Sequence, residues 1–169
     1  LENLITVTSF GTICSLGGSP GTGKTFVAAA IVSAVIKQHG ERQVAIAAPT
    51  GKAAVRVTEA LQEYGISKRA RTIHSLLEID QAGSGDGWSF VHKKGNPLDV
   101  RFLIVDEASM IDTDLMASLL AARASGTHLL FVGDVNQLAP VSHGAPLRDK
   151  ITSGIPYGEL TEIRRYSGQ

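Results

Sequence analysis

Residues 18–25 read GSPGTGKT and combine glycines, a lysine and a hydroxyl side chain. They match the pattern G-x-x-x-x-G-K-[ST], in which backbone N–H groups, a lysine ammonium and a hydroxyl converge on phosphate oxygens. The stretch lies between an apolar run, 12–16, and a long helix-like run, 24–40, which is the context that this motif requires. The sequence therefore predicts a nucleoside triphosphate site, with a plain glycine-rich turn as the alternative.

The residue types in this loop suggest how each would contact the nucleotide. Glycines let the backbone curl so that consecutive N–H groups point inward, and the helix that follows adds the positive end of its dipole. The Lys24 ammonium would reach the β- and γ-phosphates, and the Thr25 hydroxyl would ligate Mg²⁺. The predicted cofactor-binding set is Gly18, Ser19, Pro20, Gly21, Thr22, Gly23, Lys24, Thr25 and Phe26.

Two carboxylates, Asp106 and Glu107, follow the apolar run FLIV. An apolar strand ending in Asp is the pattern of the Mg²⁺-holding aspartate in P-loop ATPases. A glutamate directly beside it is placed to orient or deprotonate an attacking water. Hydrolysis needs such a group, whereas a small-molecule kinase must keep water out. The alternative for Glu107 is a residue that only favours the following turn.

A glutamine, Gln137, lies in the run GDVNQLAPV shortly after another apolar stretch, HLLFV. Its amide offers two donors and one acceptor without a charge. Such a group can hydrogen-bond a γ-phosphate oxygen or the attacking water and release it at little cost when the phosphate leaves. Gln137 is therefore either a sensor of the γ-phosphate or an ordinary glutamine in a turn.

The elements that would position these residues alternate short apolar runs with longer amphipathic ones. Apolar strands that alternate with helices predict an α/β fold, with a parallel sheet covered by helices on both faces. Ligands of such sheets bind at the carboxyl ends of the strands. We expect strands over 12–16, 43–48, 101–106, 128–134 and near 158–163, and helices over 24–40, 51–65, 72–79, 112–126 and near 145–152.

The glycine-rich stretch 80–99 is expected to be a loop with a short hairpin around 88–92. That hairpin could face DNA or be a plain surface insertion. Helix boundaries are indicated by Gly40 after the first helix and by Asp112 as an N-cap.

Composition limits the classes of function. The chain has 169 residues, 43% hydrophobic and 19% charged, which suits one globular domain. Lys plus Arg equals Asp plus Glu at 16 each, so any site for a polyanion must be a local patch. The single cysteine, Cys14, cannot form a disulfide within the chain and is expected to be a small buried hydrophobe. No apolar run approaches the ~20 residues of a membrane span and no signal peptide is evident, so a cytoplasmic protein without a membrane partner is expected.

Several motifs occur in a fixed order: GGSPGTGKT, AAPTGKAAVRVTE, RTIHSLL, VDEASM, GDVNQLAPV and LTEIRR. The series resembles the first motor domain (RecA-like, 1A) of superfamily 1 DNA helicases. It is most similar to the RecD-like branch, which includes exonuclease V alpha subunits and the helicase parts of conjugative relaxases. The resemblance runs from about Gly17 to Arg165. It implies a P-loop NTPase fold with a RecA-like sheet, ATP and Mg²⁺ as cofactors, and single-stranded DNA as a partner.

The resemblance also implies roles at individual positions. Lys24 and Thr25 match the triphosphate and Mg²⁺ residues, while Asp106 and Glu107 match the metal ligand and the catalytic base. Gln137 matches the glutamine that senses the γ-phosphate. The motif LTEIRR resembles the one whose arginine contacts the γ-phosphate, and Arg165 aligns best with it, with Arg164 as the second choice.

For single-stranded DNA, the resemblance points to the motifs APTGKAA and TIHS, and so to Pro49, Thr50, Gly51, Lys52, Thr72 and His74. From the residues themselves, Thr50 can cap a helix whose free N–H groups face a backbone phosphate, and Lys52 adds charge. The basic run KRAR, 68–71, lies beside this set, although it could equally be a solvated helix end and His74 a packing residue. Binding by this chain alone should be weak and sensitive to salt.

Two departures from the family pattern qualify these expectations. No glutamine precedes the first apolar run, so selectivity for adenine is not indicated. The chain ends soon after the last motif, so we expect a single RecA-like ATPase domain, 1–169, that is a fragment, hydrolyses ATP slowly and does not unwind DNA by itself. Its partners would be a second motor domain of the same parent protein and subunits for recombination, repair or conjugation.

The function predicted on this basis is that of the ATP-hydrolysing motor of a 5′–3′ DNA helicase, coupling hydrolysis to movement along single-stranded DNA in the intact protein. One alternative is a nucleotide-dependent switch that binds single-stranded DNA without productive turnover. The other is a P-loop small-molecule kinase. The Asp106-Glu107 pair and Gln137 argue against the kinase, as does the lack of an Arg-rich lid.

Overall fold

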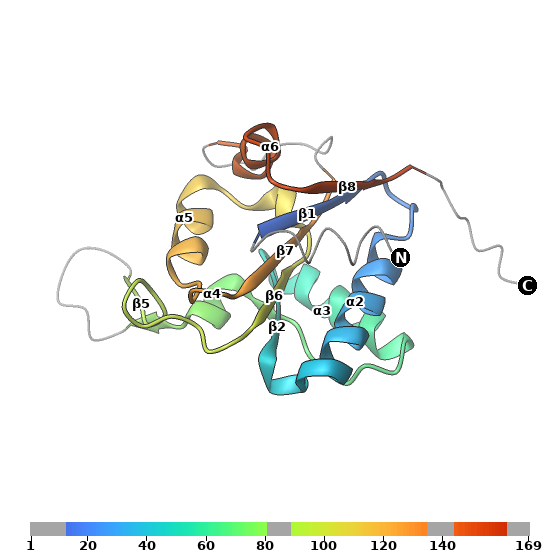
Figure 1. Cartoon of the computed structure of the whole chain (residues 1–169), viewed down its shortest axis with the longest axis horizontal. Helices are drawn as coiled ribbons and strands as arrows, with labels where there is room; N and C mark the ends of the chain where they lie inside the picture. Colours follow the sequence, from blue (N-terminus) through green and yellow to red (C-terminus); the bar gives the residue numbers. More distant parts are fainter. Residues whose placement is uncertain (1–12, 81–88, 135–143, 162–169) are drawn as a thin grey trace, which may run out of the picture.

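The computed structural model describes residues 13–80, 89–134 and 144–161 of the chain. Its centre is a six-stranded sheet with the order β3-β2-β6-β7-β1-β8, and every neighbouring pair is parallel (Figure 1). The expected parallel sheet is therefore confirmed. The strands are β1 (Ile13–Gly18), β2 (Val44–Ala48), β3 (Arg71–Thr72), β6 (Phe102–Val105), β7 (His128–Val132) and β8 (Tyr157–Leu160).

Helices cover both faces of the sheet, as predicted (Figure 1). Alternate residues of β6 point to opposite faces of the sheet. Ile104 packs in the buried cluster on one face, while Leu103 and Val105 pack in the cluster on the other. The first cluster includes side chains of α2 (Lys24–His39) and α3 (Gly51–Glu63). The second includes side chains of α4 (Ile73–Leu77), α5 (Thr113–Ala121) and α6 (Pro146–Thr152). The strands are apolar throughout because both of their faces are buried.

The strand order brings distant parts of the sequence to one edge of the sheet. β7 pairs with β6 on one side and with β1 on the other. The loop after β1 and the carboxylates after β6 therefore lie at the carboxyl ends of strands that flank β7. The carboxyl ends of β2 and β3 lie on this same side of the sheet, next to that of β6, and they lie level with each other because Ala48 pairs in register with Thr72.

Most helix ends follow the local signals in the sequence. Gly40, with φ 85°, ends α2, while the side chains of Thr50 and Asp112 accept hydrogen bonds from the backbone N–H groups of Ala53 (3.2 Å) and Leu115 (2.8 Å). These predicted caps are confirmed. None of the helices in the described ranges combines the length and apolar character needed to cross a membrane.

The prediction of a helix over 112–126 is wrong at its end, because α5 stops at Ala121. The carbonyl of Ala122 instead accepts a hydrogen bond from the N–H of Leu98 (2.8 Å), and the Thr127 hydroxyl donates to the carbonyl of Val100 (2.7 Å). Because residues 122–127 bond to the chain before β6, they do not continue the helix. Gly126, with φ 85°, completes the turn into β7.

Part of the stretch 80–99 forms a second, two-stranded sheet. β4 (Ile79–Asp80) pairs antiparallel with β5 (Ser89–Phe90), and Ile79 lies opposite Phe90. The hairpin expected around 88–92 thus has one strand at its predicted place, while its partner strand lies before residue 81. Trp88 lies outside the described residues.

The single cysteine is buried at the start of the sheet, as predicted. Cys14 is 3% exposed and lies in β1. Burial raises the pKa of its thiol to about 11, so the nucleophilic thiolate is scarce at neutral pH. We expect no reaction of the folded protein with an aromatic disulfide reagent at pH 8, followed by release of one equivalent of chromophore in denaturant. Fast labelling of the folded protein would contradict this placement.

Candidate nucleotide and nucleic-acid site

The predicted phosphate loop connects β1 to α2 through backbone that glycine alone adopts easily. Gly21 and Gly23 have φ values of 83° and 85°, in the left-handed region. A Cβ atom at Gly18 would lie 2.6 Å from the Thr22 hydroxyl and 2.8 Å from the carbonyl oxygen of Leu160. The Thr22 hydroxyl in turn donates to the carbonyl of Ser19 (2.8 Å) and closes the turn. The loop therefore curls tightly above the end of β1.

The first turn of α2 is suited to an anion. No side chain caps this end of the helix and no acidic residue lies in its first turn, so its N–H groups and positive dipole end stay available. The Lys24 ammonium donates to the carbonyl oxygens of Gly18 and Ser19, which holds it over the loop. Thr25 and Phe26 are exposed, and the Phe26 ring contacts that of Tyr64 edge to face at 5.4 Å. The loop thus offers backbone donors, a positive charge and a hydroxyl on one side of the helix terminus.

The acidic pair lies at the carboxyl end of β6, as predicted. The N–H of Asp106 donates to the carbonyl of Ala47 (2.9 Å), and the N–H of Glu107 donates to Oδ1 of Asp106 (2.9 Å). Burial raises the pKa of Asp106 to about 6, and the negative charge of Glu107 acts in the same direction. The Glu107 N–H and the positive charge of Lys24 act against this rise. The acidic pair and the loop that holds Lys24 thus follow two strands, β6 and β1, that both pair with β7.

The donors at this site suit Mg²⁺ that arrives with a nucleotide. No group of three or more His, Cys, Asp or Glu side chains within the described ranges could hold a metal ion by itself. Mg²⁺ commonly binds through one or two protein oxygens together with phosphate oxygens and water. A hydroxyl at Thr25 and a carboxylate at Asp106 are such a set, and Glu107 adds a second carboxylate.

Asp106 should also make stability depend on pH. Its pKa rises from 3.8 to about 6 on folding, so the folded state favours the neutral carboxyl. The free energy of unfolding therefore falls as the pH rises from about 4 to about 6, by at most about 3 kcal/mol. Asp106→Asn keeps an acceptor for the Glu107 N–H and carries no charge. We expect this variant to be more stable than the wild type above pH 6 and similar to it below pH 4.

Urea unfolding between pH 4 and 8 in the absence of Mg²⁺ measures this difference. If the free energy of unfolding of Asp106→Asn differed from that of the wild type by the same amount at every pH in that range, the raised pKa of Asp106 would be contradicted.

A carboxylate that sequence reasoning missed, Asp134, follows β7 at the same edge of the sheet. It is 4% exposed. Burial raises the pKa of Tyr157, and the negative charges of Glu159 and Asp134 raise it further. The Tyr157 ring lies against Gly17, where a Cβ atom would collide with it. An acidic residue after an apolar strand was the signal that identified Asp106, and a similar signal was present at Asp134, which follows β7 with only Gly133 between them.

Three predicted residues lie outside the described part of the chain. These are the proposed sensor Gln137 and the two arginines of the last motif, Arg164 and Arg165. Their roles remain predictions.

The residues predicted to contact DNA lie at the ends of β2 and β3. Residues 49–52 lead from β2 into α3, whose first turn contains no acidic residue and starts with Gly51 and Lys52 exposed. Thr72 ends β3 and caps α4 by accepting from the N–H of Ser75 (3.0 Å). His74 is exposed, and its ring lies 5.8 Å from that of Phe90. The strand pairing therefore brings residues 49–52 close to Thr72, with His74 on the first turn beyond.

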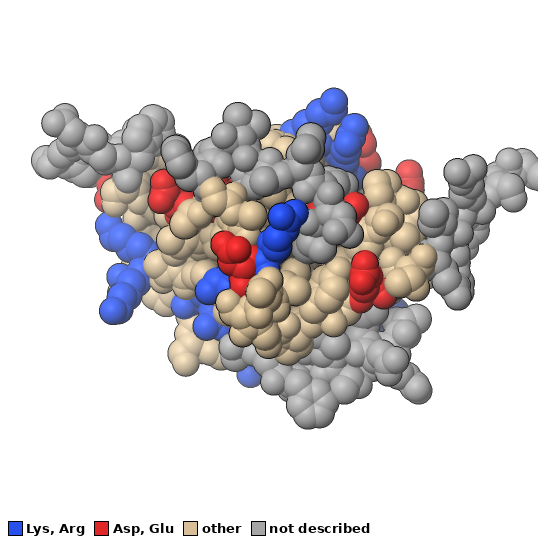
Figure 2. All heavy atoms as spheres, turned by 90° about the horizontal axis from the view of Figure 1, so that it is seen from above, with Lys and Arg blue, Asp and Glu red and all other residues tan. Residues whose placement is uncertain are grey.

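The basic run 68–71 does not form a helix end. Residues 68–70 lie in the connection between α3 and β3, Arg71 is the first residue of β3, and the members of the run face different surroundings. Lys68 donates to the carbonyl of Glu41 (3.0 Å), which precedes β2, whereas Arg71 contacts α4. In the view of Figure 2, positive and negative side chains are scattered among neutral ones, with no broad area of one sign on the described part of the face that it shows.

Comparison with known proteins agrees with this arrangement. A family of AAA domains (AAA_19) matches residues 3–143. The RecBCD enzyme subunit RecD of Mycobacterium tuberculosis is 40% identical over 152 residues, covering 80% of this chain and 26% of that protein. The ATP-dependent RecD2 DNA helicase of Deinococcus radiodurans is 38% identical over 154 residues, covering 91% of this chain and 20% of that protein. The chain thus spans about a quarter or less of the length of these relatives.

Solved structures agree on the fold. The Pif1 helicase of Candida albicans superposes with a TM-score of 0.66 at 25% identity, covering 99% of this chain and 40% of that chain. Unliganded Pif1 from Bacteroides sp. gives a TM-score of 0.60 at 21% identity, covering 99% of this chain and 42% of that chain. The six-stranded parallel sheet with helices on both faces is thus the RecA-like P-loop fold of these helicases.

Proposed function

Since this chain belongs to the AAA_19 family of AAA domains and is a relative of RecD helicase subunits, we propose that it binds ATP with Mg²⁺ and hydrolyses it as a motor domain of a superfamily 1 DNA helicase. One observation carries this proposal. The phosphate loop follows β1 and the carboxylate pair follows β6, and because both strands pair with β7 in parallel, the two segments lie on the same side of the sheet.

The proposed chemistry uses groups at that edge. The backbone N–H groups of the loop and the Lys24 ammonium bind the β- and γ-phosphates and stabilise the negative charge that grows there during hydrolysis. Thr25 and Asp106 would hold Mg²⁺ together with the nucleotide, and the ion would supply further positive charge to the phosphates. Glu107 orients the attacking water and accepts its proton. Gln137 and Arg165 are proposed to contact the γ-phosphate.

We further propose that single-stranded DNA crosses the ends of β2 and β3. The adjacent placement of residues 49–52 and Thr72 supports this, as does the exposure of Lys52 and His74. One relative is an ATP-dependent DNA helicase by name. In the intact protein, hydrolysis would drive movement along the strand in the 5′ to 3′ direction, together with a second motor domain.

The test measures ATP turnover with and without a single-stranded oligonucleotide, in the natural protein that carries this chain. Stimulation of turnover by the oligonucleotide is expected, together with strand displacement from a duplex with a 5′ single-stranded tail. No stimulation at low salt would contradict the motor function. Displacement only from a 3′-tailed duplex would reverse the proposed direction while leaving the ATPase assignment intact.

A second candidate is a switch that binds nucleotide and DNA without productive turnover. Tight ATP binding with no turnover in the intact protein would support this candidate.

A further inference from the structure

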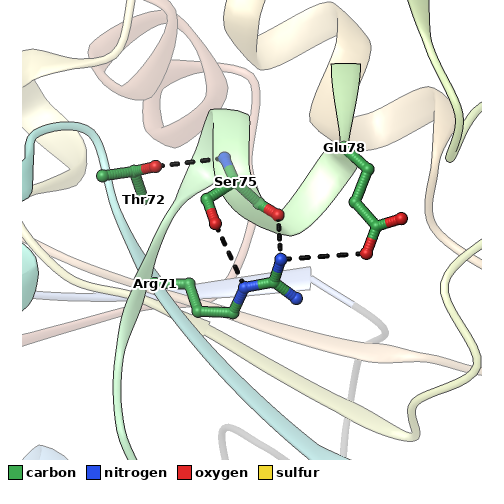
Figure 3. A network of polar contacts seen from close by, with 4 residues as sticks. All are labelled: Arg71, Thr72, Ser75 and Glu78. Carbon is green, nitrogen blue, oxygen red and sulfur yellow. Dashed lines mark hydrogen bonds and ion pairs between the residues drawn. The ribbon is translucent and has the colours of Figure 1, made fainter. Parts of the chain in front are cut away.

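Arg71, at the start of β3, is held in place by α4 (Figure 3). Its Nε donates to the Ser75 hydroxyl (3.3 Å), and its Nη2 donates to the Ser75 carbonyl. Nη2 also lies 3.7 Å from Oε1 of Glu78. A guanidinium carries five N–H donors, so two of them bind Ser75 while others remain available to an acceptor.

The two kinds of contact differ in strength. Charge-assisted hydrogen bonds join atoms about 2.7–2.9 Å apart, so the Arg71–Glu78 pair at 3.7 Å is a loose ion pair. The Arg71 and Glu78 side chains are 47% and 52% exposed, which weakens the pair further by solvent screening. The contacts with Ser75 therefore fix the guanidinium, whereas the carboxylate of Glu78 is easily displaced.

The position of Glu78 is set by its backbone. Its φ of 55° is left-handed, and it ends α4. Its N–H donates to the carbonyl of His74 (3.0 Å), and its carbonyl accepts from the N–H of Val91 (2.8 Å). Because both backbone groups are bonded, the backbone of Glu78 is held at the end of α4, and its side chain stays within reach of Arg71 although the carboxylate itself is only loosely held.

Arg71 lies where a phosphate of a bound strand would pass. It precedes Thr72 and pairs in register with Ala47, next to the strand end that leads into residues 49–52. Phosphate oxygens carry negative charge and accept the two parallel bonds that a guanidinium offers, as a carboxylate does. A phosphate and the Glu78 carboxylate would thus compete for the same donors.

We propose that Arg71 binds a backbone phosphate of single-stranded DNA and that Glu78 is its built-in competitor, which the phosphate displaces. This inference rests on the proposed function, because it requires a DNA strand at this edge. Glu78 lowers affinity in two ways: it occupies the guanidinium and it repels the incoming phosphate. The Arg71–Glu78 pair thereby sets how strongly the surface holds a strand.

Fluorescence anisotropy with a labelled oligothymidine, over a series of salt concentrations, tests this inference. Glu78→Gln should tighten binding about threefold at low salt, mainly because it frees the Arg71 guanidinium and to a smaller extent because it removes one negative charge from a screened surface. Arg71→Gln should weaken binding about tenfold and reduce the slope of log K against log salt by about one. Arg71→Lys should keep most of the slope of log K against log salt but lose part of the affinity. Lysine keeps the positive charge but cannot offer the two parallel N–H donors of a guanidinium.

A variant that carries both Arg71→Gln and Glu78→Gln shows whether Glu78 competes with the phosphate for Arg71 or only adds negative charge to the surface. If Glu78 acts through Arg71, Glu78→Gln should give a much smaller gain in the Arg71→Gln background. An equal gain in both backgrounds would overturn the competition. The matched control is Asp80→Asn, which removes the negative charge of the nearby half-buried Asp80 and loosens its ion pair with Lys93 (3.9 Å). The same tightening by Asp80→Asn would show that any lost negative charge suffices.

Failure of the inference can be told apart from failure of the proposed function. Wild-type protein that shows no salt-dependent binding of the oligonucleotide would overturn the DNA surface and this inference together. Wild-type binding that all Arg71 and Glu78 variants leave unchanged would overturn this inference alone. Thermal unfolding of each variant checks that the folded state is retained.

Discussion

Replacing Lys24 with alanine is expected to weaken ATP–Mg²⁺ binding by about ten- to a hundredfold, since a hydrogen bond to a charged group contributes about 1.5–3 kcal/mol. Turnover should fall further, because the ammonium also stabilises charge that grows on the phosphates during hydrolysis. The side chain already lies over the loop through its bonds to Gly18 and Ser19. Titration with a fluorescent ATP analogue measures the affinity, and phosphate release measures the turnover.

Lys37→Ala is the matched control for this prediction. Lys37 is exposed in the last turn of the same helix, away from the loop, so its loss should leave affinity and turnover close to wild type. Unchanged ATP affinity in Lys24→Ala would contradict the phosphate-loop assignment. Thermal unfolding of both variants shows whether the loss of the contacts with Gly18 and Ser19 loosens the fold.

Glu107→Gln is expected to keep nucleotide binding while turnover falls by about a hundredfold to ten-thousandfold, the usual range for loss of a general base. Glutamine has nearly the same shape as glutamate and leaves the bond from the residue 107 N–H to Asp106 intact. It cannot accept the proton of the attacking water. Single-turnover hydrolysis measures the chemical step, and analogue titration measures binding.

The matched control here is Glu63→Gln, which removes an exposed carboxylate at the end of α3. It should leave both quantities unchanged. If Glu107→Gln retains full turnover, another group activates the water. Asp134, buried after β7 at the same edge of the sheet, would then be the next carboxylate to replace.

Local signals were enough to predict the elements that build the sheet. Strands buried on both faces require continuous apolar runs, and the caps at Thr50 and Asp112 depend on residues close in sequence. The phosphate loop could also be predicted from the sequence, because its geometry requires glycines at fixed positions. The loop after β1 and the acidic pair after β6 therefore followed from the residues, whereas Gln137, Arg164 and Arg165 lie outside the described part of the chain.

Features that depend on contacts between distant segments could not be predicted in this way. The end of α5 is decided by the bond between Leu98 and Ala122, which no local pattern signals. β3 is only two residues long, too short for an alternating pattern, and Glu78 is not a residue type that favours a positive φ. The Arg71–Glu78 pair depends on both, so it could not be foreseen from the basic run alone.

The backbone of Glu107 has a consequence for attempts to make this domain more robust. Its φ of 52° is left-handed, a conformation that costs a residue other than glycine about 1–2 kcal/mol. Substituting glycine there would relieve that cost, and a search guided only by melting temperature would select it. The same change would delete the proposed base. Position 107 is thus a place where thermostability and catalysis favour different amino acids, and it should be held fixed while the rest of the domain is optimised.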